Sequence, residues 1–392
     1  MPHYSVYFID EPGTKHVAGE LITAESGNDV RMQFRYSPEY LANDDLPSLD
    51  PVAIKKGPAP ISFVSLPRAF DDCLPGSWGK RWLIRSKGIA RSEQRDYQLL
   101  KYIDEGHIGG LFFKDKQAPE IQDVKTANRM AQMVFDLDAN GKLTNTGNMP
   151  TDAVHSSGGM RPKFTATLFG EHKLIKMESS RDTRDIVALE HIAMTFAKSS
   201  GLNVAATEIQ KFGDRKGLCV QRFDINNAGG RHHKLSMKTL LQADEYTVAS
   251  YGDMATIIHR YSAAAAADAH QLYKQMLINV VVSNRDDHLR NFELHWIGGG
   301  WRLTPAYDIL PSEDGEIYHA TRFGLNEYVD RWSELLALAK KFKLSDTQAC
   351  EIRDEIIEAL VLLPKIISDS KINDQDASWL TELTSKQSSI LK

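Results

Sequence analysis

The chain has 392 residues, of which 42% are hydrophobic, and this is enough to bury one large core or two to three cores of ordinary size. Its formal net charge of -5 excludes the overall cationic field on which non-specific nucleic-acid binding relies. The three cysteines (Cys73, Cys219, Cys350) are far apart and form no CxxC pair, so neither a disulfide framework nor a thiolate metal site is expected. The N-terminus lacks a signal-peptide pattern, and no apolar run approaches the roughly eighteen residues of a membrane span. We therefore expect a soluble protein of the reducing cytoplasm.

Residues 1–150 are expected to form a module of their own. Short strand-like pieces, HYSVYFI, DVRMQFRY and ISFVSLP, alternate with Pro and Gly, and a helix is predicted near Ile121–Leu137. The stretch Gly141–Gly159 is rich in Gly, Asn, Ser and Thr, which is typical of a connection or a mobile loop. We place a boundary near residue 150.

The rest of the chain changes from strands to helices. KFTATLFGEHKLIKM and VAATEIQKFGDRKGLCVQRFD each predict a hairpin, with a helix over Asp185–Ser199 between them. Beyond about residue 235 the pattern is mostly helical, in SMKTLLQA, Ala263–Val282, WSELLALAKKF and TQACEIRDEIIEALVLL. We expect a β-rich segment over 151–230 and a helical segment over 231–392.

A burst of polar residues, SNRDDHLRNFE, follows the apolar run QMLINVVV. Asp286 and Asn291 have the D-x-x-x-x-N spacing of a kinase catalytic loop, in which the Asp accepts a proton from the attacking hydroxyl and the Asn binds Mg²⁺. The spacing alone is weak, and a charged loop capping a buried helix is the simpler alternative. A predicted hairpin then carries Asp308 at its far end, where it would be either a second Mg²⁺ ligand or a helix N-cap.

A phosphate cradle and a cation are predicted upstream of this loop. In SSGGMRPK, Gly158 and Gly159 would let backbone N–H groups wrap phosphates, although an ordinary flexible turn has the same composition. Lys176, in the strand KLIKM, would point into a cleft toward phosphates or would be an edge-strand charge. Glu190 is a possible partner for Lys176, but we favour an exposed helix charge.

The adjacent histidines of RHHK (231–234) do not predict a metal site. Neighbouring side chains diverge on any regular element, and no third ligand lies at a recognised spacing. We expect a solvated loop.

Taken together, these stretches resemble the HipA family of bacterial toxin serine/threonine kinases. FRYSPEYLA, ISFVSLP and LPGSWG resemble the family's N-terminal region, and SSGGMRPK resembles its phosphate-binding loop. KLIKM resembles the strand with the ATP lysine, CVQRFD the hinge, NRDDHLRN the catalytic loop and LTPAYDIL the metal-binding segment. The motifs follow the family order over most of the chain. The resemblance implies an α+β, two-lobed protein-kinase-like fold, with an N-terminal α/β subdomain, a β-rich N-lobe and a mostly α-helical C-lobe.

The resemblance also assigns roles to individual residues. It makes Asp286 the catalytic base, and Asn291 and Asp308 the Mg²⁺ ligands. The ATP-binding positions would be Ser157, Gly158, Gly159, Lys176, Gln221, Phe223 and His288, with the backbone of Gln221 and Phe223 contacting adenine. Ser156 would be the loop serine whose autophosphorylation inactivates the kinase. The sequence departs from the family pattern at Met160–Pro162 and at Gln221, which replaces a glutamate.

The implied activity is that of an ATP- and Mg²⁺-dependent protein kinase, the toxin of a toxin–antitoxin system. Its expected substrate is a translation factor or an aminoacyl-tRNA synthetase. Its expected partner is a small, HipB-like DNA-binding antitoxin, through which it would reach DNA only indirectly, and no membrane partner is expected. Two alternatives remain, a small-molecule kinase with the same lobes and a catalytically silent repressor partner. The intact Lys176, Asp286, Asn291 and Asp308 argue against the silent protein.

Overall fold

The computed structural model describes residues 3–26, 29–113, 124–140, 161–244, 246–312 and 317–392. The N-terminal part of the chain builds a five-stranded antiparallel sheet in the order β4-β3-β2-β1-β5. Its strands are β1 (His3–Ile9), β2 (Lys15–Ser26), β3 (Asp29–Tyr36), β4 (Ile61–Phe63) and β5 (Leu111–Phe112). Three of these strands, β1, β3 and β4, lie where the sequence predicted them.

Alternation of side chains decides which face of this sheet is buried. In β3, Met32, Phe34 and Tyr36 point into the core, whereas Gln33 and Arg35 between them are exposed. Short helices pack around the sheet, namely α1 (Pro38–Ala42), α2 (Arg68–Asp71), α3 (Ser77–Ser86) and α4 (Asp96–Leu99). Two 3-10 helices, η1 (Arg91–Glu93) and η2 (Leu100–Tyr102), lie beside α4 in the chain.

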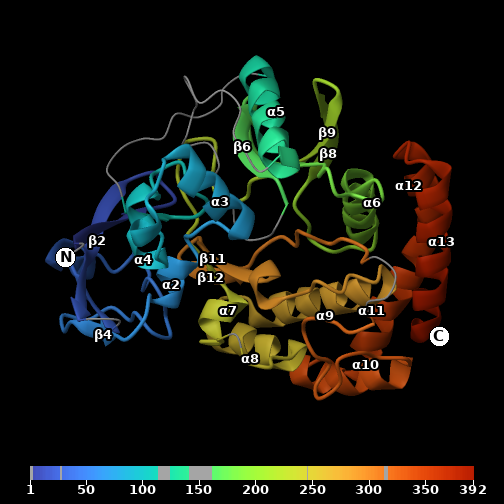
Figure 1. The fold of residues 1–392 in the computed structure, drawn as a ribbon. Helices are drawn as coiled ribbons and strands as arrows, with labels where there is room; N and C mark the ends of the chain where they lie inside the picture. Colours follow the sequence, from blue (N-terminus) through green and yellow to red (C-terminus); the bar gives the residue numbers. More distant parts are fainter. Residues whose placement is uncertain (1–2, 27–28, 114–123, 141–160, 245, 313–316) are drawn as a thin grey trace.

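A second, four-stranded antiparallel sheet has the order β6-β7-β9-β8. Its strands are β6 (Lys163–Leu168), β7 (Glu171–Met177), β8 (Thr207–Phe212) and β9 (Arg215–Gln221), which confirms both predicted hairpins. Helix α5 (Val124–Asn140) covers one side of this sheet (Figure 1). Trp78 and Trp82 of α3 join α5 and the sheet in one small core.

Helix α6 (Ile186–Ser199) also packs against this sheet. The side chain of Asp185 caps its first turn by accepting a bond from the Ala188 N–H, 3.1 Å long. The helix stops at Ser200 because Gly201 follows with a φ of +75°, a left-handed conformation that suits glycine. The apolar face of α6 enters the large core that runs through the protein.

The C-terminal part is mostly helical, as predicted. It contains α7 (Met237–Leu240), α8 (Tyr251–Tyr261), α9 (Ala265–Val281), α10 (Trp332–Leu338), α11 (Asp346–Ala359), α12 (Leu363–Asp369) and α13 (Asp374–Ser388). Its 3-10 helices are η3 (Leu289–Asn291), η4 (Ala339–Phe342), η5 (Leu360–Leu362) and η6 (Ser389–Leu391). A three-stranded sheet of β10 (Lys234–Ser236), β11 (Glu293–Ile297) and β12 (Gly300–Leu303) lies between these helices and the N-terminal part (Figure 1).

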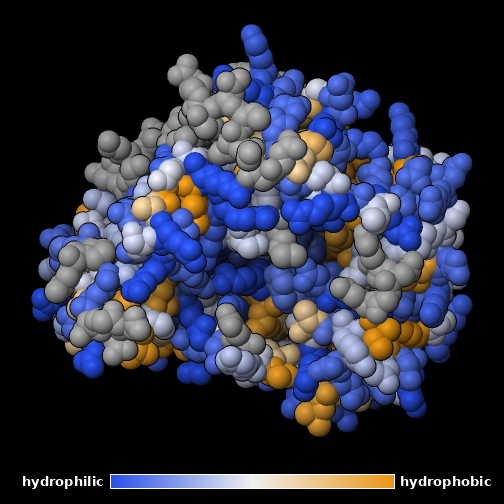
Figure 2. Space-filling model, in the orientation of Figure 1, coloured by the Kyte–Doolittle hydropathy of each residue, from blue (hydrophilic) through white to orange (hydrophobic). Residues whose placement is uncertain are grey.

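The helical part and the four-stranded sheet face each other across a hollow. In the space-filling view, this hollow lies near the middle of the face and its visible surface is mostly hydrophilic (Figure 2). Within the described ranges, we find no helix with the length and apolar character that a bilayer crossing requires.

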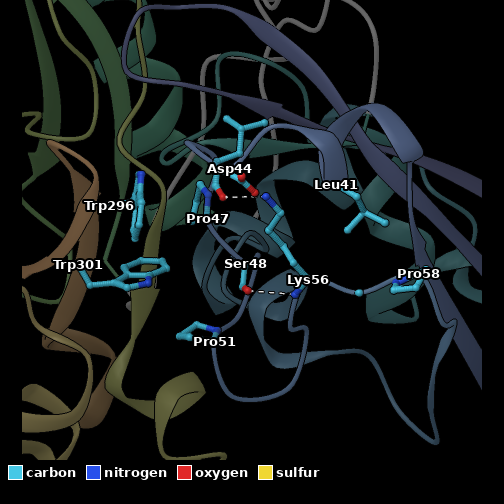
Figure 3. A pocket seen from close by; sticks show the side chains of 11 residues that line it. Leu41, Asp44, Pro47, Ser48, Pro51, Lys56, Pro58, Trp296 and Trp301 are labelled. Carbon is cyan, nitrogen blue, oxygen red and sulfur yellow. Dashed lines mark hydrogen bonds between the residues drawn. The ribbon is translucent and has the colours of Figure 1, made fainter.

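A separate pocket lies where the N-terminal part meets the β11–β12 hairpin (Figure 3). Trp296 and Trp301 form one wall, and the opposite wall carries Ser48 and Lys56, whose backbone N–H donates to the Ser48 hydroxyl. None of the residues that line it is among the predicted site residues.

Candidate active site

The predicted phosphate loop lies outside the described residues. This applies to Ser156, Ser157, Gly158 and Gly159. The description resumes at Arg161, two residues before β6 begins.

Lys176 joins β7, α6 and the segment that follows β12. It lies on β7, a central strand of its sheet, and its Nζ donates to Glu190 Oε1 of α6 and to Asp308 Oδ1, both at 2.5 Å. The side chains of Lys176 and Glu190 are buried, while that of Asp308 is 33% exposed. Lys176 is therefore no edge-strand charge, and it meets a residue 132 positions further along the chain.

The structure decides between the alternatives that the sequence left open for Glu190 and for Asp308. The interpretation of Glu190 as an exposed helix charge was wrong, because the buried face of α6 carries it onto Lys176. Asp308 does not cap a helix, because residues 309–312 form none. Its φ of +58° is an uncommon conformation for a residue that is not glycine, and it is the kind of strain that gathers at functional sites.

The charges in this cluster shift one another's pKa values. Burial alone would lower the pKa of Lys176, but the carboxylates of Asp308 and Glu190 outweigh burial and raise it. Burial likewise opposes ionisation of Asp308, yet Lys176 and Lys163 hold the pKa of Asp308 well below its usual range. Burial raises the pKa of Glu190 against the pull of Lys176.

Lys163 is a further member of the site that sequence reasoning missed. It begins β6 directly opposite Lys176 in the strand register, and it is buried. Burial, aided by the charge of Lys176 and opposed by that of Asp308, lowers the pKa of Lys163 to about 8. Its position four residues after Gly159 was the available signal.

The loop SNRDDHLRN follows the buried helix α9, as the sequence indicated. The side chain of Asp286 is 81% exposed, and His288 Nε2 lies 3.9 Å from its Oδ1. Asn291, in η3, donates from its side-chain nitrogen to the Asp286 carbonyl at 2.8 Å. The bond fixes Asn291 against the loop backbone and leaves its amide oxygen as the group that could meet a cation.

Asp287 behaves oppositely to its neighbour, and its role was not predicted. It is fully buried, and its Oδ2 accepts bonds from the Tyr251 hydroxyl at 2.6 Å and from His319 Nδ1 at 2.9 Å. The Thr321 N–H donates to its Oδ1 at 3.2 Å. Asp287 therefore ties the loop to the helical core while Asp286 faces solvent.

Arg290 ties the same loop to the N-terminal part. Its guanidinium donates to Asp71 of α2 at 2.6 Å and lies 3.6 Å from Asp72. Its carbonyl accepts from the hydroxyl of Tyr307, the residue before Asp308. Bonds to the helical core and to the N-terminal part therefore fix the loop that carries the exposed Asp286.

The predicted hinge lines a small pocket next to Lys176. Leu174, Val220, Gln221 and Phe223 line it together with Ile108 of the N-terminal part, which the sequence did not indicate. The Gln221 N–H already donates to the Ala206 carbonyl, and the Phe223 carbonyl meets His232 Nδ1 at 2.8 Å.

A second buried cluster holds the hinge in place. Arg222 binds both carboxylate oxygens of Asp224, at 3.0 and 2.8 Å, and also donates to the His107 carbonyl. The Gly109 N–H donates to Asp224 at 2.7 Å. The hinge is therefore attached to loop 104–110 of the N-terminal part.

The prediction of a solvated loop for RHHK was wrong. All four side chains are buried, and Lys234 opens the buried strand β10 and pairs with Glu293 at 2.5 Å. His233 lies 2.9 Å from the Leu49 carbonyl. Within the described part of the chain, no three His, Cys, Asp or Glu side chains are grouped so as to hold a metal ion.

Comparison with known proteins places this geometry in a family. Residues 14–114 match the HipA N-terminal domain, and residues 155–362 match the HipA-like C-terminal domain. The serine/threonine-protein kinase toxin HipA of Shewanella oneidensis is 27% identical over 270 residues, which are 60% of this chain and 61% of that protein. Toxin YjjJ of Escherichia coli is 25% identical over 241 residues, or 54% of each chain. The chain thus matches less than two thirds of the length of these curated relatives.

A solved structure extends the likeness to nearly the whole chain. It is the complex of Shewanella oneidensis HipA with HipB and operator DNA, with a TM-score of 0.73 and 18% identity over 98% of this chain and 96% of that one. At this identity the likeness shows the fold, a mixed α+β HipA-like fold with β-rich sheets and a helical C-terminal region. The two domain matches cover most of the chain in the family order, and the chain therefore belongs to the HipA family.

Proposed function

We propose that the protein is an ATP- and Mg²⁺-dependent serine/threonine protein kinase that acts as the toxin of a toxin–antitoxin system. The observation that carries this proposal is Lys176, which bridges Glu190 and Asp308, together with the exposed Asp286 of the loop after α9. A lysine–glutamate pair and an aspartate from a following segment are the parts with which kinases hold nucleotide phosphates and metal. We further propose that residues 1–150, 151–230 and 231–392 are its N-terminal subdomain, N-lobe and C-lobe.

The hinge pocket would hold the adenine. Leu174 and Val220 supply apolar contact for the base. Because the Gln221 N–H and the Phe223 carbonyl are engaged, the Gln221 carbonyl and the Phe223 N–H are the groups proposed to bind it. The proposed adenine contacts are therefore one backbone acceptor, from Gln221, and one backbone donor, from Phe223.

The phosphates would lie against Lys176 and Lys163, with His288 assisting from the catalytic loop. Asp308 and Asn291 offer a carboxylate and an amide oxygen, the hard donors that Mg²⁺ prefers, so the residues present fit the ion. When bound, Mg²⁺ would neutralise phosphate charge. Lys176 would then exchange Asp308 for a phosphate oxygen.

Asp286 would act as the base. It takes the proton of the acceptor hydroxyl while that oxygen bonds to the γ-phosphorus and the bond from the γ-phosphorus to the bridging β–γ oxygen breaks, leaving ADP. Asp287 and Arg290 position Asp286 through the loop backbone, and positioning supplies a large share of catalysis in phosphoryl transfer.

Regulation and partners extend the proposal. Autophosphorylation of Ser156 would add a charge near -2 that competes with ATP phosphates for the amides around Ser157, Gly158 and Gly159, and would switch the kinase off. A small DNA-binding antitoxin is the proposed partner, and a translation-related protein such as an aminoacyl-tRNA synthetase is the proposed substrate. Mass spectrometry of wild-type protein and Asp286→Asn tests the switch, which requires phosphate on Ser156 or Ser157 in the wild type and on neither serine in the variant.

Calorimetric titration with ATP, with and without Mg²⁺, tests the proposed site directly. We expect Mg²⁺-dependent binding that Lys176→Met weakens and that Lys365→Met, on the exposed surface of α12, leaves unchanged. Absence of binding by folded, unphosphorylated protein would refute the kinase proposal. Labelled ATP added with a cell lysate then separates a protein substrate, which retains label on a gel, from a small-molecule one.

A further inference from the structure

A groove outside the nucleotide cleft runs between the five-stranded sheet and α7. Its walls come from β3, the residues after β4, α2, the start of α4 and α7. We call it the α2 groove, and four of its lining residues are cations, Arg31, Arg68, Arg95 and Lys238. The chain as a whole has a net charge of -5, so this groove is a positively charged region on a protein that is negative overall.

The carboxylates of the α2 groove do not cancel this charge. Asp96 is paired with Lys80 at 2.7 Å, and Asp71 is paired with Arg290 at 2.6 Å. Asp244 is held by the Thr247 hydroxyl and the Tyr246 N–H of its own turn. Two of the three carboxylates in the groove are therefore already paired with cations that do not line it. Only the third carboxylate, that of Asp244, is left to offset the four cations of the groove.

The four cations have few partners of their own. Among the residues that the structure describes, Arg95 alone of the four lies within 4.0 Å of a carboxylate, that of Glu25 at 3.9 Å. Both of those side chains are more than a third exposed, so the pair is weak. A ligand with negative charge would meet cations that have only weak partners within the described part of the protein.

The α2 groove adjoins the catalytic loop. Asp71, in its wall, holds Arg290, four residues after Asp286. Helix α7, which contributes Lys238, packs against η3 of the same loop. A chain lying in the groove would therefore enter the region of the catalytic loop from the side of the N-terminal part.

Apolar groups separate the cations and favour a peptide over a nucleic acid. Val30, Leu66 and Tyr97 line the groove, and Val64 is 89% exposed beside them. A nucleic-acid backbone needs cations and stacking surfaces, whereas aliphatic side chains in the groove match those of a protein segment.

We propose that the α2 groove docks an acidic, partly apolar segment of the protein that the kinase phosphorylates. This inference rests on the proposed function, because it names the class of substrate that the same site would receive. Docking beside the loop would raise the local concentration of the acceptor hydroxyl at Asp286. The arginines and Lys238 would act mainly through long-range attraction, so the interaction should weaken as salt is added.

Peptide binding without nucleotide separates this inference from the kinase proposal. The probe is a fluorescein-labelled peptide of alternating glutamate and leucine, measured by fluorescence anisotropy in the full-length protein. A lysine–leucine peptide and a single-stranded RNA of equal length serve as comparison ligands. The test variant is Arg68→Glu with Lys238→Glu, and the matched control is Lys365→Glu with Lys386→Glu, two exposed lysines of α12 and α13.

We expect the acidic peptide to bind wild type and control alike, and the test variant about tenfold more weakly or worse, as is typical of reversed charges in electrostatic binding. Circular dichroism and ATP titration check that the test variant is folded with an intact nucleotide site. No binding of the acidic peptide, or equal binding by the test variant, would overturn the inference. Tighter binding of RNA through the same two residues would also overturn it, because the groove would then serve nucleic acid.

Discussion

Two charge clusters contribute residues to the lining of the hinge pocket, and they differ in how completely their charges are bonded. In the hinge cluster, Arg222 binds both oxygens of Asp224, each side chain is 3% exposed, and the Gly109 N–H adds a further bond. In the nucleotide cluster, Lys176 is shared by Glu190 and the one-third-exposed Asp308. We call the first cluster closed, because both of its side chains are buried, and the second open, because Asp308 is partly exposed.

This difference separates residues that hold the fold from residues that can change partners. Burial opposes ionisation of Asp224, but Arg222 outweighs it and lowers the pKa of Asp224, so that pair stays charged and fixed. Asp308 is also kept ionised, but among the described residues its side chain bonds only to a lysine, which a phosphate could take over. We therefore expect changes in the hinge cluster to cost stability and changes around the nucleotide cluster to cost activity.

The neighbours Asp286 and Asp287 repeat this contrast and give the largest expected effect. Asp286→Asn removes a base and keeps the shape, so phosphoryl transfer should fall by about 10²- to 10⁴-fold while ATP binding stays nearly intact. Because the Asp286 side chain is 81% exposed, the free energy of unfolding should change by no more than about 0.5 kcal/mol. Transfer from labelled ATP and urea unfolding measure the two quantities.

Asp287→Asn is the matched control for that variant. It weakens the bonds from Tyr251 and His319 in a fully buried site, and the free energy of unfolding should fall by about 1.5–3 kcal/mol. If Asp286→Asn retained wild-type transfer, the catalytic-loop assignment would be wrong. If it destabilised the protein as much as Asp287→Asn, the division of roles between the two aspartates would fail.

Asp224→Asn tests the closed cluster. It leaves Arg222 buried without its counter-charge, and breaking one side of a buried ion pair costs about 3–5 kcal/mol of unfolding free energy. The midpoint of urea denaturation should drop accordingly, measured by intrinsic fluorescence. A loss below about 1 kcal/mol, the range of exposed pairs, would show that the cluster is not closed as described.

Asp308→Asn tests the open cluster. Lys176 keeps Glu190 as a partner and Asp308 is partly exposed, so unfolding should change little. The affinity for Mg-ATP should fall by at least about 10- to 100-fold, the range found for residues that only support metal ligands. Calorimetry with and without Mg²⁺ separates loss of metal binding from loss of nucleotide binding. Unchanged Mg-ATP affinity would contradict the metal role of Asp308.

Local sequence patterns predicted most of the secondary structure and several contacts of the site. Alternation in KLIKM and the turn before it gave the β6–β7 hairpin, because strand pairing across a short turn is a local event. The D-x-x-x-x-N spacing located a polar loop after a buried helix. The closeness of Lys176 and Asp308 could be suggested only through resemblance, because their meeting depends on how two parts of the chain pack.

The missed features share one physical cause, which is burial of polar groups by distant partners. RHHK reads as solvated because four polar residues carry no local sign of burial, yet Glu293 and the Leu49 carbonyl satisfy two of them from far along the chain. Glu190 is another case, since helical periodicity does not reveal that Lys176 will neutralise it. A buried charge becomes predictable only when its partner is known.

Lys163 gives the smallest expected effect, a proton taken up when nucleotide binds. Its pKa of about 8 lies below the ordinary lysine value, because it is buried beside Lys176, so it is about half charged at pH 8. Negative phosphates in the cleft would favour its charged form and raise this pKa. ATP binding at pH 8 should therefore be accompanied by uptake of about half a proton, because Lys163 carries fewer protons on average in the free protein than in the complex.

Calorimetric titrations of Mg-ATP in buffers of different ionisation enthalpy measure that uptake. We expect the wild type to take up about half a proton more than Lys163→Met at pH 8, and we expect this difference to vanish at pH 6.5, where Lys163 is already charged. Taking the difference between the two proteins removes the contribution of ATP itself. Equal proton uptake by both proteins at pH 8 would place Lys163 outside the reach of the phosphates. Lys176 would then be the lysine of the open cluster that contacts the nucleotide.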